Sequence, residues 1–312
     1  MSDTLDSMTV YSVGEGDIDV NLDLWLSHLA SKNLSRHTIS SYETAVRLLA
    51  DFLRDQGMPI AVGKVKRDHV EAFIAHVLET RTPSTAATRY RCLRPFFKWL
   101  EAEGEIRDSP MSKTEAPRVP EQLPPVLADD DLRRLLRTCG GNDNNFERIR
   151  DLCLLRLLIK TGCRRGELAS VKIDDVLISR EGMLLRVLGK GGTFRLLPLD
   201  EQTAKAVKKY RRRRQDHARR ELSELFLGHF GALGPGGVSA VVRRRAQQAG
   251  LKHVYAHLLR HTWAHRLQCS DIGELNVQTL GGWRSPIMLR RYGASAKQSR
   301  AIAAFRRLDD DL

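Results

Sequence analysis

The stretch MLLRVLGKGGTFRLLPLD, residues 183–200, interrupts the helical pattern that the sequence shows on both sides of it. Two short runs rich in strand-forming residues, 183–188 and 194–199, flank Gly189-Lys190-Gly191-Gly192. Glycines between two such runs are typical of a β-hairpin, because glycine adopts the backbone conformations that a tight turn needs. The sequence therefore predicts one small antiparallel sheet in a chain that is otherwise mainly α-helical.

Helical segments are predicted on both sides of this hairpin. They are residues 127–139 and 144–162 before it, and residues 201–220 and 238–250 after it. We expect these segments and the hairpin to form one mostly α domain, which the sequence predicts over residues 127–312.

A second helical region is predicted nearer the N-terminus. Apolar residues recur at helical spacing in four segments, which are residues 21–32, 34–57, 66–80 and 82–104. Ser35 or Thr38 is expected to cap the second helix, and Gly57 is expected to end it. Pro95 lies inside the fourth segment, where proline costs about 3 kcal/mol or kinks the helix. These segments predict a small helical bundle.

Proline marks the boundary between the two regions. Residues 109–126, SPMSKTEAPRVPEQLPPV, contain five of the eleven prolines and are predicted to form a semi-rigid linker. We therefore expect a flexible tail over 1–18, a helical domain over 19–108, this linker, and the second domain over 127–312. The linker could let the domains close around a duplex as a clamp, or it could be a tether alone.

The charge of the chain favours a polyanionic partner. The formal net charge is +13, from 51 Lys and Arg against 38 Asp and Glu. Lysine and arginine that neutralise phosphates release condensed counterions, so such an excess favours binding to nucleic acid. A basic protein with no nucleic-acid partner is the alternative.

Other features argue against a membrane or secreted protein. No apolar run approaches the roughly 18–20 residues of a membrane helix, and the acidic N-terminus does not resemble a secretory signal. The five cysteines are widely scattered and include no C-x-x-C pair. We expect reduced thiols rather than disulfides or a zinc ribbon. The sequence thus predicts a cytoplasmic protein.

The first candidate for chemistry lies in TGCRRGELASVKIDDV, residues 161–176. Gly162 is expected to end one helix, and Arg164-x-x-Glu167 to open the next. Residues at i and i+3 share a helix face, so Glu167 could hold the guanidinium of Arg164 toward a phosphate. A surface ion pair of little consequence is the alternative.

Two further candidates carry cations and an imidazole. Lys190 lies at the tip of the glycine hairpin, where it could follow a DNA groove or donate a proton, or be an ordinary loop lysine. His257 and Arg260 share a face in HLLRHTWAHR, residues 257–266, which suits acid–base work on a phosphodiester. Histidines also recur every four residues there, which is metal-ligand spacing, but the H-E-x-x-H arrangement is missing.

The last candidates lie in GGWRSPIMLRRYGASAKQ, residues 281–298. The Trp283 indole offers one N–H donor and no acceptor. The hydroxyl of Tyr292 is a candidate reactive group. Packing roles are the alternative for both rings. Elsewhere, dense arginine runs predict contacts with phosphate or a solvated helix face.

These pieces, in this order, resemble the tyrosine recombinases, or phage integrase family. TGCRRGEL resembles the box of the first arginine, LGKGGTFRLLPL the β-hairpin, HLLRHTWA the H-x-x-R box, and GGWRSPIMLRRY the closing box. Trp283 and Tyr292 show the nine-residue spacing of that last box. The N-terminal helices resemble the family's core-binding, SAM-like domain, which implies that the domain over 19–108 binds DNA. The resemblance covers roughly residues 20–300, and it implies a two-domain recombinase without an added arm-binding domain.

The resemblance implies an enzyme that cleaves and rejoins duplex DNA through a 3′-phosphotyrosyl intermediate. It makes Tyr292 the nucleophile and implies catalytic roles for the residues of the four boxes, namely Arg164, Lys190, His257, Arg260 and Trp283. Glu167 and Asp175 resemble the family's residues that hold these catalytic side chains in place. It implies no metal, because arginines replace the cation, and no cofactor or ATP.

Double-stranded DNA at a specific recombination site is the implied partner. We expect the DNA contacts to include Arg195, Arg211, Arg212, Arg243, Arg244, Arg290 and Arg291. The resemblance implies a monomer in free solution that forms a homo-tetramer on paired sites and associates with the nucleoid. The amphipathic tail SAKQSRAIAAFRRL, residues 295–308, is predicted to dock on a neighbouring protomer, with packing in cis as the alternative. An inactive DNA-binding regulator and a type IB topoisomerase-like enzyme are the competing functions.

Overall fold

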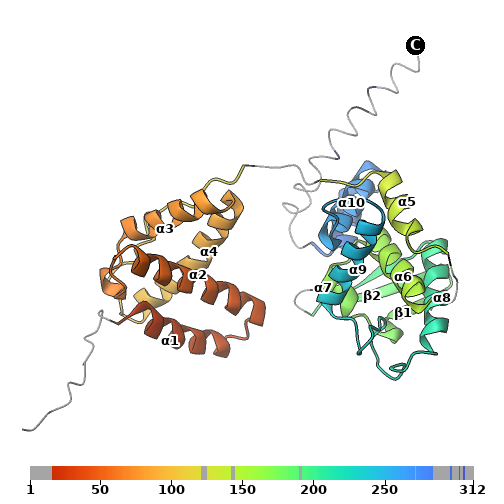
Figure 1. Ribbon diagram of the computed structural model, residues 1–312, viewed down its shortest axis with the longest axis horizontal. Helices are drawn as coiled ribbons and strands as arrows, with labels where there is room; N and C mark the ends of the chain where they lie inside the picture. The colour runs from red at the N-terminus through yellow and green to blue at the C-terminus, as the bar shows by residue number, and fades with distance from the viewer. Residues whose placement is uncertain are drawn as a thin grey trace, which may run out of the picture. The chain divides into compact units, whose positions relative to one another are not determined.

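The computed structural model describes most of the chain. The described residues are 16–120, 125–141, 145–189, 192–270 and 272–283, with the single residues Ala296, Ile302 and Phe305. Two compact units divide between residues 121 and 122 (Figure 1). The division falls inside the predicted linker.

The first part of that linker is tied to the N-terminal unit. The Tyr90 hydroxyl donates to the carbonyl oxygen of Thr114 at 2.7 Å, and Met111 is only 2% exposed. Residues 109–114 therefore pack with the helices before them.

The N-terminal unit is the predicted helical bundle. Its helices are α1 (Ile18–Ser31), α2 (Arg36–Asp55), α3 (Arg67–Thr80) and α4 (Pro83–Ala102), with a 3-10 turn at Val62–Lys64. Asp17, Ser35 and Thr82 cap α1, α2 and α4 by accepting backbone N–H groups with their side chains. Ser35, rather than Thr38, is the cap of α2, since its Oγ accepts the Thr38 N–H at 3.1 Å.

Aromatic side chains fill the core of this bundle. Trp25 of α1 is 1% exposed and stacks on Tyr42 of α2 with 5.4 Å between ring centroids. Trp25 also meets Phe96 of α4 at 5.2 Å, and Phe97 is fully buried beside it. Rings of this size bury enough apolar surface to hold a small helical unit together.

The C-terminal unit is mostly helical. Its elements are α5 (Asp129–Arg137), α6 (Phe146–Thr161), α7 (Arg165–Ala169), a 3-10 turn (Ile173–Asp175), β1 (Val176–Ser179), β2 (Gly182–Leu188), β3 (Phe194–Pro198), α8 (Glu201–Arg214), α9 (Pro235–Gln248), α10 (Ala256–Cys269) and α11 (Glu274–Gly281). The prediction of a mainly α fold with one small antiparallel sheet is confirmed.

Helix α6 is the central element of this unit. It contacts α5, α8, α9 and α10, and its apolar side chains, such as Leu154, Leu155 and Leu158, are at most 1% exposed. A helix that is apolar around most of its circumference is buried on all sides. The end of α6 is consequently fixed in the middle of the domain, where Gly162 follows it.

The sheet has the order β1-β2-β3 with both pairs antiparallel. Leu185 pairs with Val176 on one side and with Leu197 on the other, and all three side chains face the core. The hairpin β2–β3 was predicted, whereas β1 was not. Strand β3 contacts α11, and this contact brings the base of the hairpin to the candidate site.

In the part of the chain that the structure describes, no helix is long and apolar enough to cross a membrane.

Candidate active site

Arg164 lies at the junction between α6 and α7. Gly162 ends α6 with a left-handed backbone, φ 59°, and Arg164 is the N-cap residue of α7. The Glu167 carboxylate accepts the Arg164 backbone N–H at 2.7 Å and its Nη1 at 2.6 Å. The side chain of Arg164 is 39% exposed and that of Glu167 only 7%. The guanidinium is therefore held from the protein side and open on the other.

Glu167 also binds a second arginine. Arg195 of β3 donates Nη1 to Oε1 at 3.1 Å and Nη2 to Oε2 at 2.7 Å. Burial alone would raise the pKa of Glu167, but the hydrogen bonds from Arg195 and Arg164 outweigh it and lower the pKa to about 2. The carboxylate is thus ionised at neutral pH and shared between two cations.

Arg260 reaches this junction from α10. It is 1% exposed and donates Nη1 to the Gly162 carbonyl at 2.6 Å and Nη2 to the Gly281 carbonyl at 2.7 Å. Its Cζ lies 4.6 Å from the ring centroid of Trp283. Arg260 therefore links the end of α6 to the end of α11, and its guanidinium lies over the Trp283 indole. We call the region around Arg164, Glu167 and Arg260 the arginine junction.

Glycines make room for these contacts. A Cβ on Gly162 would lie 2.2 Å from the ring of Trp263, and one on Gly281 would lie 2.2 Å from the ring of Trp283. Such distances do not occur in real structures, so a side chain at either position would displace a tryptophan. The glycines of TGC and LGGW are needed because backbone carbonyls and indole rings pack directly against each other.

Trp283 belongs to a small apolar cluster beside the main core. The cluster also contains Trp263, Ala264 and Val277, and Trp283 is 6% exposed. The two indole rings lie 6.0 Å apart, and the Trp283 backbone carbonyl accepts Nε2 of Gln278 at 3.0 Å. The position of the ring is therefore fixed by packing and by the hydrogen bond from Gln278 to its backbone.

His257 lies in the first turn of α10, one turn before Arg260 on the same face, and is exposed. Its ring meets that of His261 edge-on with 4.5 Å between centroids. No three or more His, Cys, Asp or Glu side chains among the described residues could hold a metal ion. The four histidines that recur every four residues, His253, His257, His261 and His265, all lie among the described residues and form no such group.

Several predicted residues lie outside the described residues, namely Lys190, Arg290, Arg291 and Tyr292. The hairpin is described up to Gly189 and again from Gly192, and the Gly189 N–H donates to the Thr193 carbonyl at 2.8 Å. The closing box is described through Trp283.

Asp175 lies at the start of the sheet rather than at the arginine junction. Its Oδ1 accepts Nε of Arg186 at 2.7 Å and its Oδ2 accepts the Lys172 N–H at 2.8 Å. Within the described chain it supports β2 and the 3-10 turn, and its hydrogen bonds do not include Arg164.

The arginine runs are divided between surface and interior. On α8, Arg212 is exposed and Arg211 half-buried, whereas Arg214 is 2% exposed and its Nη2 donates to the carbonyls of Leu222 and Glu224. A run of arginines in the sequence thus includes both exposed side chains and a buried one that binds backbone carbonyls of the same domain.

The same division appears on α9. Arg243 is exposed, but Arg244 pairs at 2.7 Å with Asp151, which is fully buried and also binds Arg150 and Arg245. A buried carboxylate needs such partners, because an unpaired charge in the interior is costly. Arg243 is consequently the more available of the two predicted DNA contacts on α9.

A pocket beside α4 gathers cations that were not among the predicted site residues. Arg91, Arg94 and Lys98 are exposed along one face of α4 and line a cavity of about 630 Å³ with Pro95. Spacing of i, i+3 and i+7 places them on one side of the helix. That spacing in RCLRPFFKWL was the signal that could have found them.

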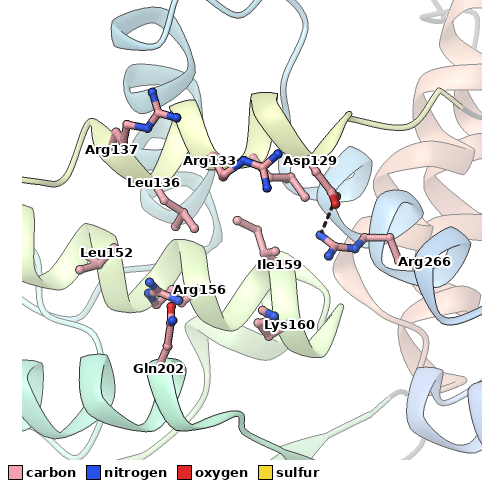
Figure 2. A pocket seen from close by; sticks show the side chains of 11 residues that line it. Asp129, Arg133, Leu136, Arg137, Leu152, Arg156, Ile159, Lys160, Gln202 and Arg266 are labelled. Atoms are coloured by element: carbon pink, nitrogen blue, oxygen red, sulfur yellow. Dashed lines mark ion pairs between the residues drawn. The ribbon is translucent and has the colours of Figure 1, made fainter. Parts of the chain in front are cut away.

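A second pocket lies in the C-terminal unit (Figure 2). It measures about 410 Å³ and has apolar lining from Leu136 and Ile159 and cationic lining from Arg156 and Arg266. Arg266 pairs with Asp129 at 3.3 Å. None of its lining residues is a candidate site residue, so this pocket is separate from the arginine junction.

Comparison with known proteins agrees with this arrangement. The model of the phage integrase family matches residues 125–299, and that of the phage integrase N-terminal SAM-like domain matches residues 22–104. Tyrosine recombinase XerC of Roseiflexus castenholzii (strain DSM 13941 / HLO8) is 31% identical over 275 residues, which cover 85% of each chain.

Solved structures share the fold. A XerH site-specific recombinase in a post-cleavage complex with a palindromic difH substrate superposes with a TM-score of 0.74 and 19% identity, over 91% of this chain and 83% of that one. A lambda integrase tetramer bound to a Holliday junction gives a TM-score of 0.67 and 19% identity, over 91% and 83%. The chain therefore belongs to the phage integrase family and is a tyrosine-type site-specific recombinase.

Proposed function

We propose that this recombinase cleaves and rejoins duplex DNA through a covalent bond between Tyr292 and a 3′-phosphate. The observation that carries the proposal is the junction at Gly162. Its carbonyl binds Arg260 at 2.6 Å, and Arg164 follows two residues later in the chain. Two arginines from distant segments are thereby held at one place, as the charge of a pentacoordinate phosphate requires.

The reaction we propose is a transesterification. The Tyr292 oxygen attacks phosphorus, the bond from phosphorus to the 5′-oxygen breaks, and a 3′-phosphotyrosine and a free 5′-hydroxyl result. Lys190 gives its proton to the leaving 5′-oxygen, and His257 assists removal of the phenol proton, since a free tyrosine has a pKa near 10. Rejoining is the reverse step, and the covalent bond conserves the energy of the phosphodiester.

The arginines stabilise charge in this proposal. Arg164 and Arg260 contact the non-bridging oxygens of the transferred phosphate, and the Trp283 indole adds an N–H donor. The open side of the Arg164 guanidinium and its fixed attachment to Glu167 suit this role, because a donor already in place does not have to reorganise during the reaction.

We infer that four protomers act on two DNA sites, in integration, excision or resolution. Exchange between two duplexes cuts four strands, one for each nucleophile. The net charge of +13 supports extended contact with DNA. The tetrameric assembly of lambda integrase on a Holliday junction, a protein of the same fold, supports this stoichiometry.

Covalent capture tests the reaction. Fragmented DNA of the host is incubated with the full chain, and the DNA that stays attached to denatured protein is sequenced to map the cleavage site. A duplex with that site and a nick near the scissile phosphate then traps the intermediate. We expect a covalent complex with the wild-type chain and none with Tyr292→Phe, whose DNA affinity should be unchanged.

Three outcomes would contradict the proposal. Cleavage by Tyr292→Phe would exclude that tyrosine as the nucleophile. Specific DNA binding by the wild-type chain with no covalent complex would favour an inactive regulator. Relaxation of supercoiled DNA without preference for a site would instead indicate an enzyme like the type IB topoisomerases.

A further inference from the structure

Arg195 was predicted from the sequence as a DNA contact, but it lies at the point where three segments of the active site meet. We propose instead that Arg195 is a positioning residue, which neutralises Glu167 so that Arg164 keeps its charge for the scissile phosphate. The inference rests on the proposed function and adds to it a residue of the hairpin box that is not one of the reactive side chains.

The first contact is with Glu167. Each oxygen of this carboxylate accepts one N–H from Arg195 and one from Arg164. One negative charge is therefore shared by two guanidinium groups, and the trio carries a net charge of +1. Without Arg195 the carboxylate and Arg164 would form a neutral pair, and a neutral pair attracts a phosphate much more weakly.

The second contact is with the segment that carries Trp283. Nε of Arg195 donates to the Leu280 carbonyl at 2.9 Å. Gly282 has a φ of +62°, and a Cβ there would lie 3.2 Å from Nη1 of Arg195. The guanidinium thus packs directly against the backbone just before Trp283, on which Arg260 rests.

The third connection is the hairpin itself. Arg195 pairs with Val187 in the β2–β3 ladder, and the Gly189 N–H donates to the Thr193 carbonyl two residues before Arg195. Anchoring this side chain at Glu167 fixes the base of the hairpin.

The hydrogen-bond acceptors of Arg195, together with its low exposure, favour positioning over a DNA contact. The side chain of Arg195 is 10% exposed, whereas that of Arg164 is 39% exposed. Its Nε, Nη1 and Nη2 all donate within the protein, and two of these three bonds go to the carboxylate of Glu167. A planar fork that makes three such bonds is a task for arginine and not for lysine.

The test compares cleavage with binding. Single-turnover covalent capture on the nicked duplex, DNA affinity by fluorescence anisotropy and thermal unfolding are measured for the wild-type chain, Arg195→Met, Arg195→Lys and the double variant Arg195→Met/Glu167→Gln. Arg214→Met is the matched control, because it removes another buried arginine from the same domain at a place away from the site.

We expect Arg195→Met to cleave about 100-fold more slowly, with DNA affinity within about threefold of the wild type. Glu167→Gln in the same chain should recover at least about tenfold of that rate, because it removes the charge that Arg195 no longer neutralises. Arg195→Lys should lie between the wild type and Arg195→Met. Arg214→Met should lower thermal stability and leave the cleavage rate of folded protein unchanged.

Different results would contradict the proposed function and the positioning role of Arg195. No covalent complex with the wild-type chain would overturn the proposed function and this role with it. Wild-type cleavage with an equally fast Arg195→Met, or with affinity reduced as much as rate, would overturn only the role of Arg195. A double variant as slow as Arg195→Met would also overturn it, since misfolding or a missing DNA contact would not respond to Glu167→Gln.

Discussion

The residues around Trp283 show how one ring can serve two purposes. In the proposed reaction its indole N–H donates to phosphate, and its face lies against the guanidinium of Arg260 with 4.6 Å from Cζ to the centroid. A cation over an aromatic face gains about 0.5–2 kcal/mol, more when it is desolvated. Arg260 is 1% exposed, so we expect the face of the ring to matter more than its N–H.

This expectation is tested by removing the N–H and the ring separately. Trp283→Phe keeps an aromatic face and should retain cleavage within about tenfold of the wild type, whereas Trp283→Ala should lose about 100-fold. The rates are measured by single-turnover covalent capture at saturating DNA. Equal losses in both variants would show that the indole N–H is the group that the reaction needs.

Glu167 gives a prediction about acid stability. Burial acts to raise its pKa, but the bonds from Arg195 and Arg164 lower it to about 2 from 4.5. A carboxyl with a lowered pKa stabilises the folded state above its unfolded pKa, and this contribution is lost as the pH falls toward the folded pKa. We therefore expect part of the free energy of unfolding to disappear between about pH 4.5 and pH 2.

The measurement is urea unfolding at several pH values for the wild type and for Glu167→Gln. The difference in unfolding free energy between the two should shrink as the pH falls through that window, because the glutamine does not titrate. A difference that is constant from pH 5 to pH 2 would mean that the carboxyl has no lowered pKa in the folded protein.

Helix α4 combines a proline with a basic face. The helix is continuous from Pro83 to Ala102 through Pro95, although a proline inside a helix was expected to cost about 3 kcal/mol or to kink it. Pro95 lines the same cavity as Arg91, Arg94 and Lys98. The exposed cations on this face are suited to contact phosphates along a groove.

Salt dependence measures such contacts. Arg91→Ala, Arg94→Ala and Lys98→Ala, made singly, should each weaken DNA binding and reduce the slope of log affinity against log salt by about 0.9 for each phosphate that is no longer neutralised. Arg67→Ala is the control, since Arg67 pairs with Glu71 at 2.7 Å on α3. Changes no larger than the control in all three variants would exclude this face as a DNA-binding surface.

The local sequence pattern was insufficient to predict the whole sheet. The β2–β3 hairpin is evident from its glycines, but β1 is a four-residue run, VLIS, in which the side chains of Ile178 and Ser179 are exposed. Its pairing with β2 through Val176 and Leu185 supplies what the short run lacks. A strand of this length is stabilised by its neighbour more than by its own sequence.

At the scale of the whole molecule, the C-terminal residues are relevant to the assembly of protomers. Ala296 is fully buried, whereas Ile302 and Phe305 are 47% and 65% exposed. These two residues are three positions apart, and residues at i and i+3 share a helix face. An apolar pair on one face fits the prediction that this tail docks on a neighbouring protomer.

Deletion tests the prediction. Removing residues 296–312 should leave binding of one protomer to its duplex intact and abolish assembly of four protomers on paired sites, as measured by sedimentation of the DNA complexes. Removing only residues 309–312, which are Asp-Asp-Asp-Leu, is the control and should leave assembly intact. Full assembly after the longer deletion would contradict docking in trans.

The sequence by itself determined most of the elements and the family. Period and capping residues placed the four helices of the N-terminal unit and most helices of the C-terminal unit, together with the hairpin, because these depend on neighbours along the chain. The order of Arg164, Lys190, His257-x-x-Arg260 and Trp283 was sufficient to indicate the recombinases. The contact between Arg164 and Glu167 also followed from spacing, since both lie in one helical turn.

Only the tertiary structure decided which charges serve the site and which serve the fold. Arg195 lies in a strand of the hairpin and Arg214 in a basic run, and neither setting indicates that one binds Glu167 and the other binds backbone carbonyls. The anchoring of Arg260 on the carbonyls of Gly162 and Gly281 joins residues 98 and 21 positions apart. Such contacts depend on how helices pack, and packing is set by the whole core rather than by any local pattern.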